Sequence, residues 1–526
     1  MTLTQPTVRV TATAVPAVVV GIGPLTLADV VAVARHDAQV VIDEAAAAEM
    51  RASRAVVDRL ADDSRPHYGI STGFGALATT GIPPAMRAQL QRSLIRSHAA
   101  GSGPEVEREV VRSLMLPRLS TLATGRTGVR VEVAETYASM LNASITPVVH
   151  EFGSLGCSGD LAPLAHCALA ATGEGRVRDV GGVLVDASDA LRAAGIEPLV
   201  LREKEGLALI NGTDGMLGML ALALADLHRL VTTADVAAAM SLEGLLGSDA
   251  VLAPDLHALR PQPGQADSAE NMRAVMRQSE IRESHRTEAC TRVQDAYSLR
   301  CAPQVAGAFR DTLDHAARVA GWELASAVDN PVVTPDGRVE SNGNFHGAPV
   351  AYVLDFLAIV VADLASISER RTDRFLDVAR NNGLPPFLAG DPGVDSGHMI
   401  AQYTQAAVVS ELKRLAAPAS VDSIPSSAMQ EDHVSMGWSA ARKLRRAVDG
   451  LTRVLAIEVL TAARGLDLRA PLRPAPATAA VVAALRETVP GPGPDRYLAP
   501  EIEAAVDLVA SGGVVRAAES VTGPLA

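Results

Sequence analysis

The chain has 526 residues, of which 48% are hydrophobic and only 3% aromatic, so it can bury a large core built mainly from aliphatic side chains. An aliphatic composition rich in Ala, Leu and Val suits closely packed helices. The 60 acidic side chains outnumber the 47 basic ones and give a formal net charge of −13, which argues against a surface for nucleic acid or anionic membranes, because those surfaces need an excess of Lys and Arg.

Cysteine usage and hydropathy indicate a cytoplasmic protein. No two cysteines form a C-x-x-C pair, and four thiols in so long a chain do not make a disulfide framework; they are Cys157, Cys167, Cys290 and Cys301. The apolar stretch 15–20 is too short for a secretion signal and contains Pro16. The segments 206–227 and 348–367 are very hydrophobic, but each carries two aspartates, so we expect buried bundle helices and no membrane span.

The N-terminal part begins with helical patterns. Amphipathic periodicity predicts a helix from Thr26 and a second one over 43–60, which Pro66 stops. The glycine-rich stretch 67–75 is predicted to be a loop, and helical periodicity resumes over 84–95. Two later apolar stretches, 180–185 and 199–201, are predicted as short strands.

From about residue 205 to about 465 the pattern predicts long helices separated by short polar breaks. These breaks fall at 211–213, 260–264, 330–331, 341–347 and 381–393, and polar loops at helix ends are places where chemistry can be presented. Proline clusters at 471–476 and 490–494 are expected to separate two short terminal helices. We therefore predict an N-terminal domain over 1–204, and a central long-helix bundle with C-terminal helices over 205–526.

Residues 153–163 place glycines and small polar side chains directly before an apolar run. Because Gly159 has no Cβ, its backbone nitrogen can approach the carbonyl carbon two residues earlier and close a five-membered ring. Dehydration of Ser158 would then leave an exocyclic methylene, an electrophile for amines and electron-rich rings. We expect Asp160 to cap a helix with Pro163 in its first turn, and the positive end of that helix to face the ring. Taken alone, the pattern is most often a loop that leads into a helix.

The wider stretch 153–166 closely resembles the signature of the histidine and aromatic amino acid ammonia-lyases. The resemblance implies a 4-methylidene-imidazol-5-one cofactor formed from Cys157, Ser158 and Gly159, with no external cofactor, although the family most often has alanine at the first of these positions. It also implies a mainly α fold of the aspartase/fumarase-like superfamily, with a long central bundle and a smaller α-rich N-terminal domain. The implied assembly is a homotetramer in which several subunits build each active site.

The same resemblance gives roles to side chains that are otherwise unremarkable. Tyr68 lies in a loop that lacks the Lys-Ser/Thr ending of a P-loop, and such a tyrosine is commonly a packing residue. In the family it is the catalytic base, a role that requires hydrogen bonds or positive charge to lower its pKa from about 10. His98 falls at a predicted helix C-terminus, where a histidine often compensates the helix dipole. In the histidine-specific branch it recognises the substrate imidazole.

A second family signature covers residues 294–301. If this stretch is helical, Gln294, Tyr297 and Arg300 share one broad face, although in isolation it reads as a solvated helix end. The resemblance implies that Arg300 binds the substrate carboxylate with its two-pronged guanidinium, with Tyr297 as a neighbouring proton or hydrogen-bond partner. It further implies that Asn211 contacts the ring oxygen and the substrate, and that Phe345 lines the site.

Residues 429–436 carry the information about the substrate. Their Gln-Glu-Asp-His run could be an ordinary polar helix start. In the histidine branch, however, a glutamate here accepts a hydrogen bond from the imidazole N–H, and Glu431 occupies its place. The position after Asn211, Gly212 and Thr213, where the family usually has glutamine, is Asp214, which affects a secondary contact.

Together these motifs predict deamination of L-histidine to trans-urocanate and ammonia, without a metal, because no His/Cys/Asp spacing resembles a metal site. The alternatives are a phenylalanine or tyrosine lyase or aminomutase with the same cofactor, a non-catalytic helical assembly protein, and a fumarase-like lyase that lacks the ring.

Overall fold

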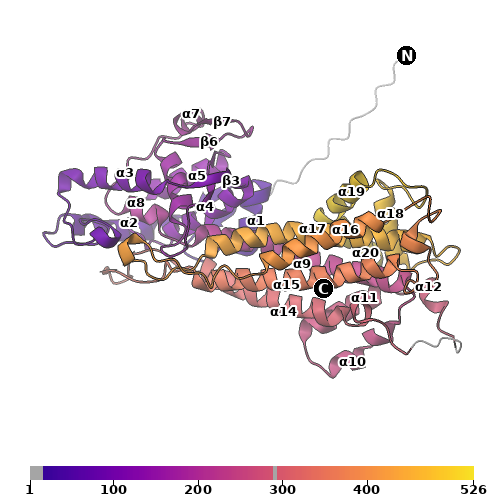
Figure 1. Cartoon of the computed structure of the whole chain (residues 1–526). Helices are drawn as coiled ribbons and strands as arrows, with labels where there is room; N and C mark the ends of the chain where they lie inside the picture. Colours follow the sequence, from indigo (N-terminus) through magenta and orange to yellow (C-terminus); the bar gives the residue numbers. More distant parts are fainter. Residues whose placement is uncertain (1–15, 288–292) are drawn as a thin grey trace, which may run out of the picture. The chain divides into compact units, whose positions relative to one another are not determined.

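The structure is a computed structural model that describes residues 16–287 and 293–526, so the predicted thiol Cys290 lies outside the described residues. It is mainly helical, which confirms the predicted fold class (Figure 1). The chain forms two compact units. The first comprises the residues up to Leu222 together with Gly321–Gly347 and Ile424–Val434, and the second comprises Ala223–Ala320, Ala348–Ser423 and Ser435–Ala526. Both units are made of several separate segments of the sequence, whereas the predicted boundary after residue 204 divides the chain into two continuous parts.

The first unit combines short helices with small sheets. Its helices are α1 (Leu27–His36), α2 (Glu44–Ala61), α3 (Arg87–His98), α4 (Arg108–Ala123), α5 (Val131–Asn142), α6 (Leu161–Ala171), α7 (Ala187–Ala193) and α8 (Glu205–Ile210), with the short 3-10 helices η1 (Gly75–Leu77), η2 (Pro84–Met86) and η5 (Ser427–Met429). Its strands are β1 (Val18–Val20), β2 (Val40–Ile42), β3 (Ser102–Glu105), β4 (Thr146–Pro147), β5 (His150–Phe152), β6 (Arg176–Arg178), β7 (Leu184–Asp186), β8 (Val332–Val333) and β9 (Val339–Glu340). β1 and β2 pair in parallel, whereas β3–β5, β4–β6–β7 and β8–β9 are antiparallel.

The second unit is helical in its described part. It contains η3 (Asp249–Leu252), α10 (Pro254–Ala258), α11 (Pro263–Val275), α12 (Glu280–Glu283), α13 (Tyr297–Arg300), α15 (Ala348–Leu376), η4 (Pro386–Leu388), α16 (Met399–Leu415), α17 (Gly437–Asp467), α18 (Pro476–Arg486), α19 (Ala499–Ala510) and α20 (Gly513–Thr522). Two long helices belong to both units in sequence, namely α9 (Asp214–Gly244) and α14 (Ala302–Leu324). Within the second unit α15, α16 and α17 pack side by side (Figure 1).

Two helices, α9 and α15, are long and apolar enough to cross a membrane by length and composition, but their most apolar windows are 83% and 61% buried within the protein. This burial agrees with the predicted bundle helices.

Local sequence signals explain where several helices start. The predicted first helix begins with a capping box at Thr26, whose hydroxyl accepts the amide N–H of Asp29 while the Asp29 carboxylate accepts the Thr26 N–H. The predicted second helix corresponds to α2, and its N-cap Asp43 accepts the amide N–H of Ala45. Both predictions are confirmed to within a few residues.

Two expectations about local structure are wrong. Of the predicted strands, only the end of 180–185 is extended, as part of β7, and 199–201 forms no strand. The Asp179 carboxylate accepts the amide N–H groups of Gly181 and Val183, which makes this stretch a turn. At the C-terminal end three helices, α18, α19 and α20, stand where two were expected, because Gly512 adopts a left-handed conformation that separates the last pair.

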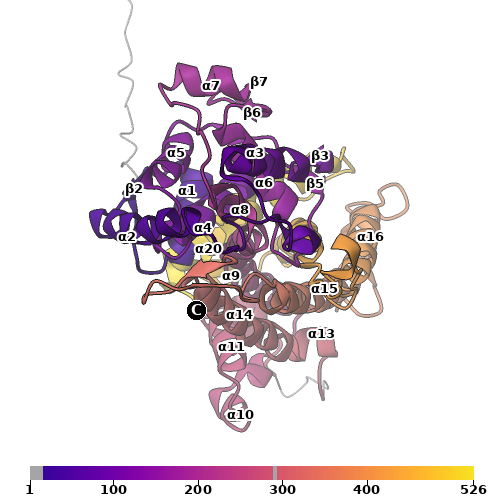
Figure 2. The same ribbon diagram turned by 90° about the vertical axis from the view of Figure 1, so that its left-hand side faces the viewer.

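Three short helices of the first unit, α3, α6 and α8, pack against one another (Figure 2). The fully buried guanidinium of Arg118 in α4 donates to the backbone carbonyls of Ala208, Asn211 and Val328, and lies 3.1 Å from the Asp214 carboxylate. A cation with this many acceptors fixes the turn between α8 and α9, because each carbonyl is held by a charged donor.

The predicted cap at the start of α6 is wrong in a specific way. Asp160 immediately precedes α6, but its side chain forms no cap bond with that helix. Instead one carboxylate oxygen accepts the amide N–H groups of Gly215 and Met216, each at 2.9 Å, and the other accepts the Ser154 hydroxyl at 2.8 Å. Asp160 therefore caps α9, and burial raises its pKa to about 7 against these hydrogen bonds.

We expect Asp160→Ala to lower the free energy of unfolding by about 1–3 kcal/mol, because the amides of Gly215 and Met216 would stay buried without an acceptor. Asp160→Asn should lose less, since its side-chain oxygen can still accept both. Asp186→Ala is the matched control, because Asp186 precedes α7 without a side-chain cap bond. Urea unfolding followed by circular dichroism measures the difference, and equal losses in Asp160→Ala and Asp186→Ala would contradict the capping role.

Candidate active site

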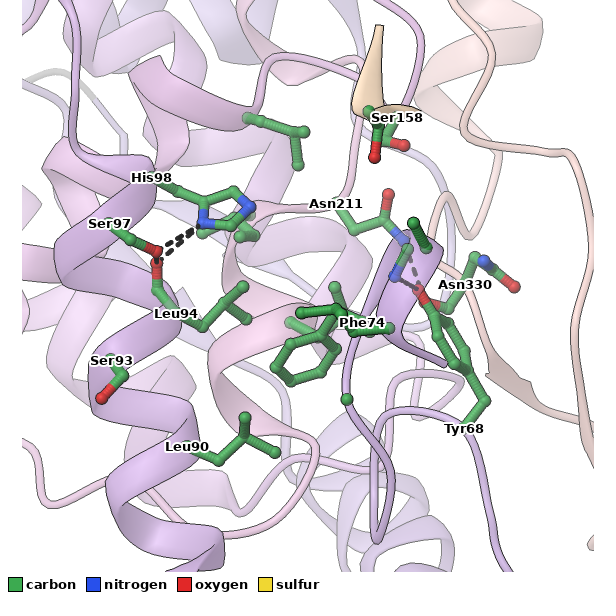
Figure 3. A pocket seen from close by; sticks show the side chains of 18 of the residues that line it. Tyr68, Phe74, Leu90, Ser93, Leu94, Ser97, His98, Ser158, Asn211 and Asn330 are labelled. Carbon is green, nitrogen blue, oxygen red and sulfur yellow. Dashed lines mark hydrogen bonds between the residues drawn. The ribbon is translucent and has the colours of Figure 1, made fainter. Parts of the chain in front are cut away.

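A cavity of about 540 Å³ lies within the first unit. It brings together five of the predicted site residues, which come from distant parts of the sequence; they are Tyr68, His98, Ser158, Asn211 and Glu431. In Figure 3, His98 and Tyr68 stand on opposite sides of the cavity, and Ser158 and Asn211 lie between them toward one end. The remaining wall is mostly apolar and is formed by the loop after Tyr68, by α3 and by α8.

The tripeptide 157–159 is held by an unusually close backbone contact. Gly159 adopts a left-handed conformation with φ of +77°, and a Cβ atom built on it would lie 2.0 Å from the carbonyl oxygen of Gly212. That same carbonyl accepts the Asp160 amide N–H at 2.7 Å. Only glycine fits here, both for conformation and for space, which is the residue that ring closure through a backbone nitrogen also requires. The residues present therefore fit a cyclised tripeptide whose serine borders the cavity.

One carboxylate contacts both other members of the tripeptide. Glu431 accepts the Ser158 hydroxyl at Oε1 and the Cys157 thiol at Oε2, each at 3.0 Å. Burial, together with the hydrogen bond to Glu431, raises the pKa of the Cys157 thiol to about 12. Since the thiolate is the nucleophilic form, Cys157 does not act as a nucleophile near neutral pH.

Tyr68 points into the cavity from the loop between α2 and η1. Its phenolic oxygen accepts the amide N–H of Gly75 at 3.2 Å, and its ring meets that of Phe74 edge-on. The sequence predicts surroundings that lower the pKa of this phenol. The Gly75 hydrogen bond acts in that direction, but burial outweighs it and the nearby carboxylates of Glu431 and Asp329 add to the rise, so the pKa of Tyr68 is raised above its usual value.

His98 is the last residue of α3, at the helix end that the sequence predicts. Its Nδ1 lies 2.9 Å from the Leu94 carbonyl oxygen, and because a carbonyl only accepts, Nδ1 carries the proton. Burial lowers the pKa of His98, so the ring is neutral at pH 7 and its Nε2 carries a lone pair. This side of the cavity therefore offers a hydrogen-bond acceptor from a neutral ring.

Asn211 ends α8, where the sequence places it in a turn. Its Nδ2 donates to the carbonyl oxygen of Asn330 at 2.9 Å (Figure 3), which fixes the orientation of the amide. Its Oδ1 is buried and has no hydrogen-bond partner among the described residues. An unsatisfied buried oxygen at the cavity wall is available to a donor on a bound molecule.

Two further positions singled out in the sequence, Asp214 and Phe345, do not line the cavity. Asp214 faces Arg118, and burial raises its pKa although Arg118 opposes this shift. Phe345 is half-buried and is not among the described residues that line the cavity, but the backbone N–H of Gly347 in the same loop donates to the Gly156 carbonyl at 3.1 Å. The loop that carries Phe345 is thus joined to the loop that carries the tripeptide.

Gln294, Tyr297 and Arg300 belong to the second unit and are not among the described residues of the cavity wall. The expected helix is shorter than predicted, because only Tyr297–Arg300 is helical and Gln294 precedes it. The three side chains nevertheless converge. Arg300 donates to the Gln294 side-chain oxygen at 2.7 Å, and its guanidinium carbon lies 4.6 Å from the centre of the Tyr297 ring.

Two contributors to the cavity could not be singled out from sequence. The carbonyl of Asn330 holds the Asn211 amide, and the N–H of Gly75 holds the Tyr68 phenol. Both act through backbone atoms, so residue type carries little signal. The nearest signals are the glycine-rich composition of 67–75 and the helix break at 330–331.

A phenol, a neutral imidazole and a carboxylate thus border one cavity together with Ser158, as the resemblance to the ammonia-lyases implies. Comparison with known proteins specifies the class. Residues 25–487 match the family model described as aromatic amino acid lyase, and the chain belongs to that family. The predicted family membership is thereby confirmed.

Individual relatives cover nearly the whole chain. Histidine ammonia-lyase from Streptomyces griseus is 67% identical over 97% of this chain and 99% of its own length, and that from Streptomyces coelicolor is 66% identical with the same coverage. Among solved structures, histidine ammonia-lyase from Trypanosoma cruzi matches with a TM-score of 0.88 at 39% identity, over 96% of this chain and 95% of its own. Tyrosine aminomutase from Streptomyces globisporus matches with a TM-score of 0.92 at 38% identity, over 97% and 100%.

Proposed function

We propose that the protein catalyses the non-oxidative deamination of L-histidine to trans-urocanate and ammonia, the first step of histidine degradation. The observation that carries this proposal is the presence of His98 and Glu431 in one cavity with Tyr68 and Ser158. An imidazole ring has one N–H to donate when it is neutral and two when it is protonated, and His98 Nε2 and the Glu431 carboxylate are both acceptors. A phenyl ring has no such donor, so these two polar groups would be desolvated without compensation. The naming of the Streptomyces relatives as histidine ammonia-lyases supports the same substrate.

The family's methylidene-imidazolone is formed here, in our proposal, by Cys157, Ser158 and Gly159. The close packing of Gly159 against Gly212 supports it, because the glycine nitrogen is held in a left-handed turn that a side chain would prevent. When present, the group supplies an electrophile that captures an electron-rich part of the substrate and so turns the amine into a leaving group. The side chain of Cys157 stays outside the ring.

Tyr68 serves as the base that takes the β-proton of the substrate. The Gly75 N–H stabilises the developing phenolate, and Phe74 packs against the ring and holds its orientation. The Asn211 Oδ1, buried and without a described partner, accepts from the substrate ammonium or a neighbouring N–H. The amide is held for this task by the Asn330 carbonyl.

Arg300 binds the substrate carboxylate, with Gln294 and Tyr297 holding its guanidinium, and Phe345 lines the site. We propose that these residues reach the cavity in a homotetramer whose subunits share active sites. Support comes from α15, where Tyr352, Phe356 and Ile359 recur at one helix face and are 58%, 44% and 44% exposed. An apolar stripe of this kind suits burial against another copy of the chain. We place the enzyme in the cytoplasm, without nucleic-acid or membrane partners.

The rival activity is that of a phenylalanine or tyrosine lyase or aminomutase. The structural similarity to tyrosine aminomutase makes tyrosine the substrate to test against histidine. We expect the purified protein to release urocanate from L-histidine and not to convert L-phenylalanine or L-tyrosine at a comparable rate. Its intact mass should be lower than the sequence mass by two water molecules, and Ser158→Ala should restore one or both waters and abolish turnover. Absorbance assays and mass spectrometry give both readouts. An unmodified wild-type mass would exclude the ring, and preferred turnover of tyrosine would favour the rival.

The raised pKa of Tyr68 predicts a pH profile. The pKa of the Tyr68 phenol lies above its usual value of about 10. The phenolate is therefore a small fraction of Tyr68 at neutral pH, and this fraction grows about tenfold per pH unit. We expect log kcat/KM for L-histidine to rise with a slope near one between about pH 7 and pH 9. Tyr68→Phe should reduce kcat by about 10²- to 10⁴-fold. Tyr137→Phe, which removes a buried phenol in α5, is the matched control and should keep its activity; a flat profile would count against Tyr68 as the base.

Sharing of sites between subunits predicts complementation. Ser158→Ala and Arg300→Ala chains should each be inactive alone, since one lacks the ring and the other lacks the carboxylate partner. Co-expressed with different tags and purified as mixed oligomers, they should recover about one quarter of wild-type activity, because random assembly pairs an intact Ser158 with an intact Arg300 at that frequency. Activity no greater than the sum of the two separate preparations would mean that each chain supplies its own Arg300.

A further inference from the structure

Glu431 lies at the end of a short loop with a strained backbone. Ser426 and Glu431 form an isolated antiparallel bridge, in which the Ser426 N–H donates to the Glu431 carbonyl at 2.9 Å and the Glu431 N–H donates back at 3.3 Å. Between them Ser427, Ala428 and Met429 all have positive φ, at 50°, 51° and 69°. Left-handed conformations cost about 1–2 kcal/mol for each residue with a side chain, so this loop persists because other interactions hold it.

The loop brings a second hydroxyl to the Glu431 carboxylate. Oε2 accepts the Ser426 hydroxyl at 3.1 Å and the Cys157 thiol at 3.0 Å. Oε1 accepts the Ser158 hydroxyl at 3.0 Å. The two oxygens therefore differ: Oε2 is held from two sides by side chains that the enzyme keeps, whereas the described donor to Oε1 is a hydroxyl that is consumed.

The Ser158 hydroxyl is lost when the ring forms, so the inference rests on the proposed function. Closure of the bond between the Gly159 nitrogen and the Cys157 carbonyl carbon releases that carbonyl oxygen as water, with the amide hydrogens of Gly159 and Ser158, and leaves a C=N bond to the Ser158 nitrogen. Dehydration of Ser158 then releases Oγ as a second water, with one hydrogen from the hydroxyl or solvent and the other from Cα. After this step Oε1 has lost its donor, while the Cys157 and Ser426 side chains are chemically unchanged.

We propose that Cys157 and Ser426 are positioning residues that anchor Glu431 through Oε2, so that Oε1, freed by the loss of the Ser158 hydroxyl, accepts the imidazole N–H of the substrate. The acceptor for the substrate ring thus becomes available in the same reaction that makes the electrophile. The cysteine found where the family commonly has alanine gains a specific task, because alanine has no donor for Oε2.

The state of the thiol is compatible with this role. Cys157 is 6% exposed, and its raised pKa keeps the S–H proton in place as a donor across the neutral range. A thiol is a weaker donor than a hydroxyl, so Ser426 supplies the stronger of the two anchors. Both hydrogen bonds end on a charged acceptor, and each is expected to matter more than a bond between neutral groups.

The anchor can be tested by equilibrium binding to full-length protein in a Ser158→Ala background, where the ring cannot form and Oε1 has no hydroxyl on it. Titration calorimetry with L-histidine should show binding without turnover. Adding Cys157→Ala or Ser426→Ala should weaken L-histidine binding by about fivefold each, because the loss reaches the ligand only through the remaining mobility of the Glu431 carboxylate. Adding Cys157→Ser instead should retain binding within about twofold, because a hydroxyl can replace the thiol as donor.

Two controls separate anchoring from general damage. Cys167→Ala removes another buried thiol, from α6, and should leave L-histidine binding unchanged. L-Phenylalanine, whose ring has no N–H, should bind the Ser158→Ala protein and its Cys157→Ala and Ser426→Ala derivatives with equal affinity. Unchanged L-histidine binding after both anchor substitutions, or equal weakening for both ligands, would overturn the proposal.

Separate measurements test the anchoring of Glu431 and the proposed function. Intact mass and urocanate release are measured on the wild-type protein, and they decide whether the ring forms and histidine is deaminated. The calorimetric series decides how Glu431 is held. In the ring-bearing enzyme the same Cys157→Ala change should raise KM for L-histidine about fivefold with kcat within about twofold, at the intact mass of a protein that has lost two waters.

Discussion

The contact between the backbones of Gly159 and Gly212 is the constraint on which the rest of the site depends. It joins the tripeptide loop to the turn between α8 and α9, and the Asp160 carboxylate reinforces it by capping α9. Because Asn211 immediately precedes Gly212, the same contact sets the distance between Ser158 and the Asn211 side-chain amide. Two segments some fifty residues apart are thereby fixed as one unit, and neither can shift without disturbing the other.

Buried charged side chains stabilise this arrangement of the turns. Arg118 holds three backbone carbonyls and the Asp214 carboxylate, and Lys204 forms a fully buried ion pair with Asp329, next to the Asn330 carbonyl that orients Asn211. Ion pairs of this kind contribute little net stability, since desolvation offsets the Coulombic gain. Their value here is positional: removing one partner would leave an uncompensated charge, so the turns around the cavity have one arrangement in which every buried charge is satisfied.

Sequence reasoning reaches side chains that belong to a motif more readily than it reaches geometry. The family resemblance groups Tyr68, His98 and Ser158, and the structure places these three residues around one cavity. They could not show that Asp160 caps α9, because the amide N–H groups that donate to it are more than fifty residues away and any helix start nearby looks equally suitable. Arg300 shows the opposite case. Its motif is clear from the sequence, but the side chains that it contacts within one chain are Gln294 and Tyr297.

The asymmetry of the Glu431 carboxylate connects the formation of the site to its selectivity. A carboxylate free to rotate would present either oxygen to a substrate, and the entropy of fixing it would be lost on binding. Here Oε2 is already held by Ser426 and Cys157, and the strained turn that presents Ser426 is closed before any substrate arrives. Ligand binding then does not have to order this carboxylate. In the proposed reaction, a preorganised acceptor in the same cavity as the neutral ring of His98 favours a ligand ring with an N–H, and a phenyl ring leaves that acceptor unpaired in a mostly apolar cavity.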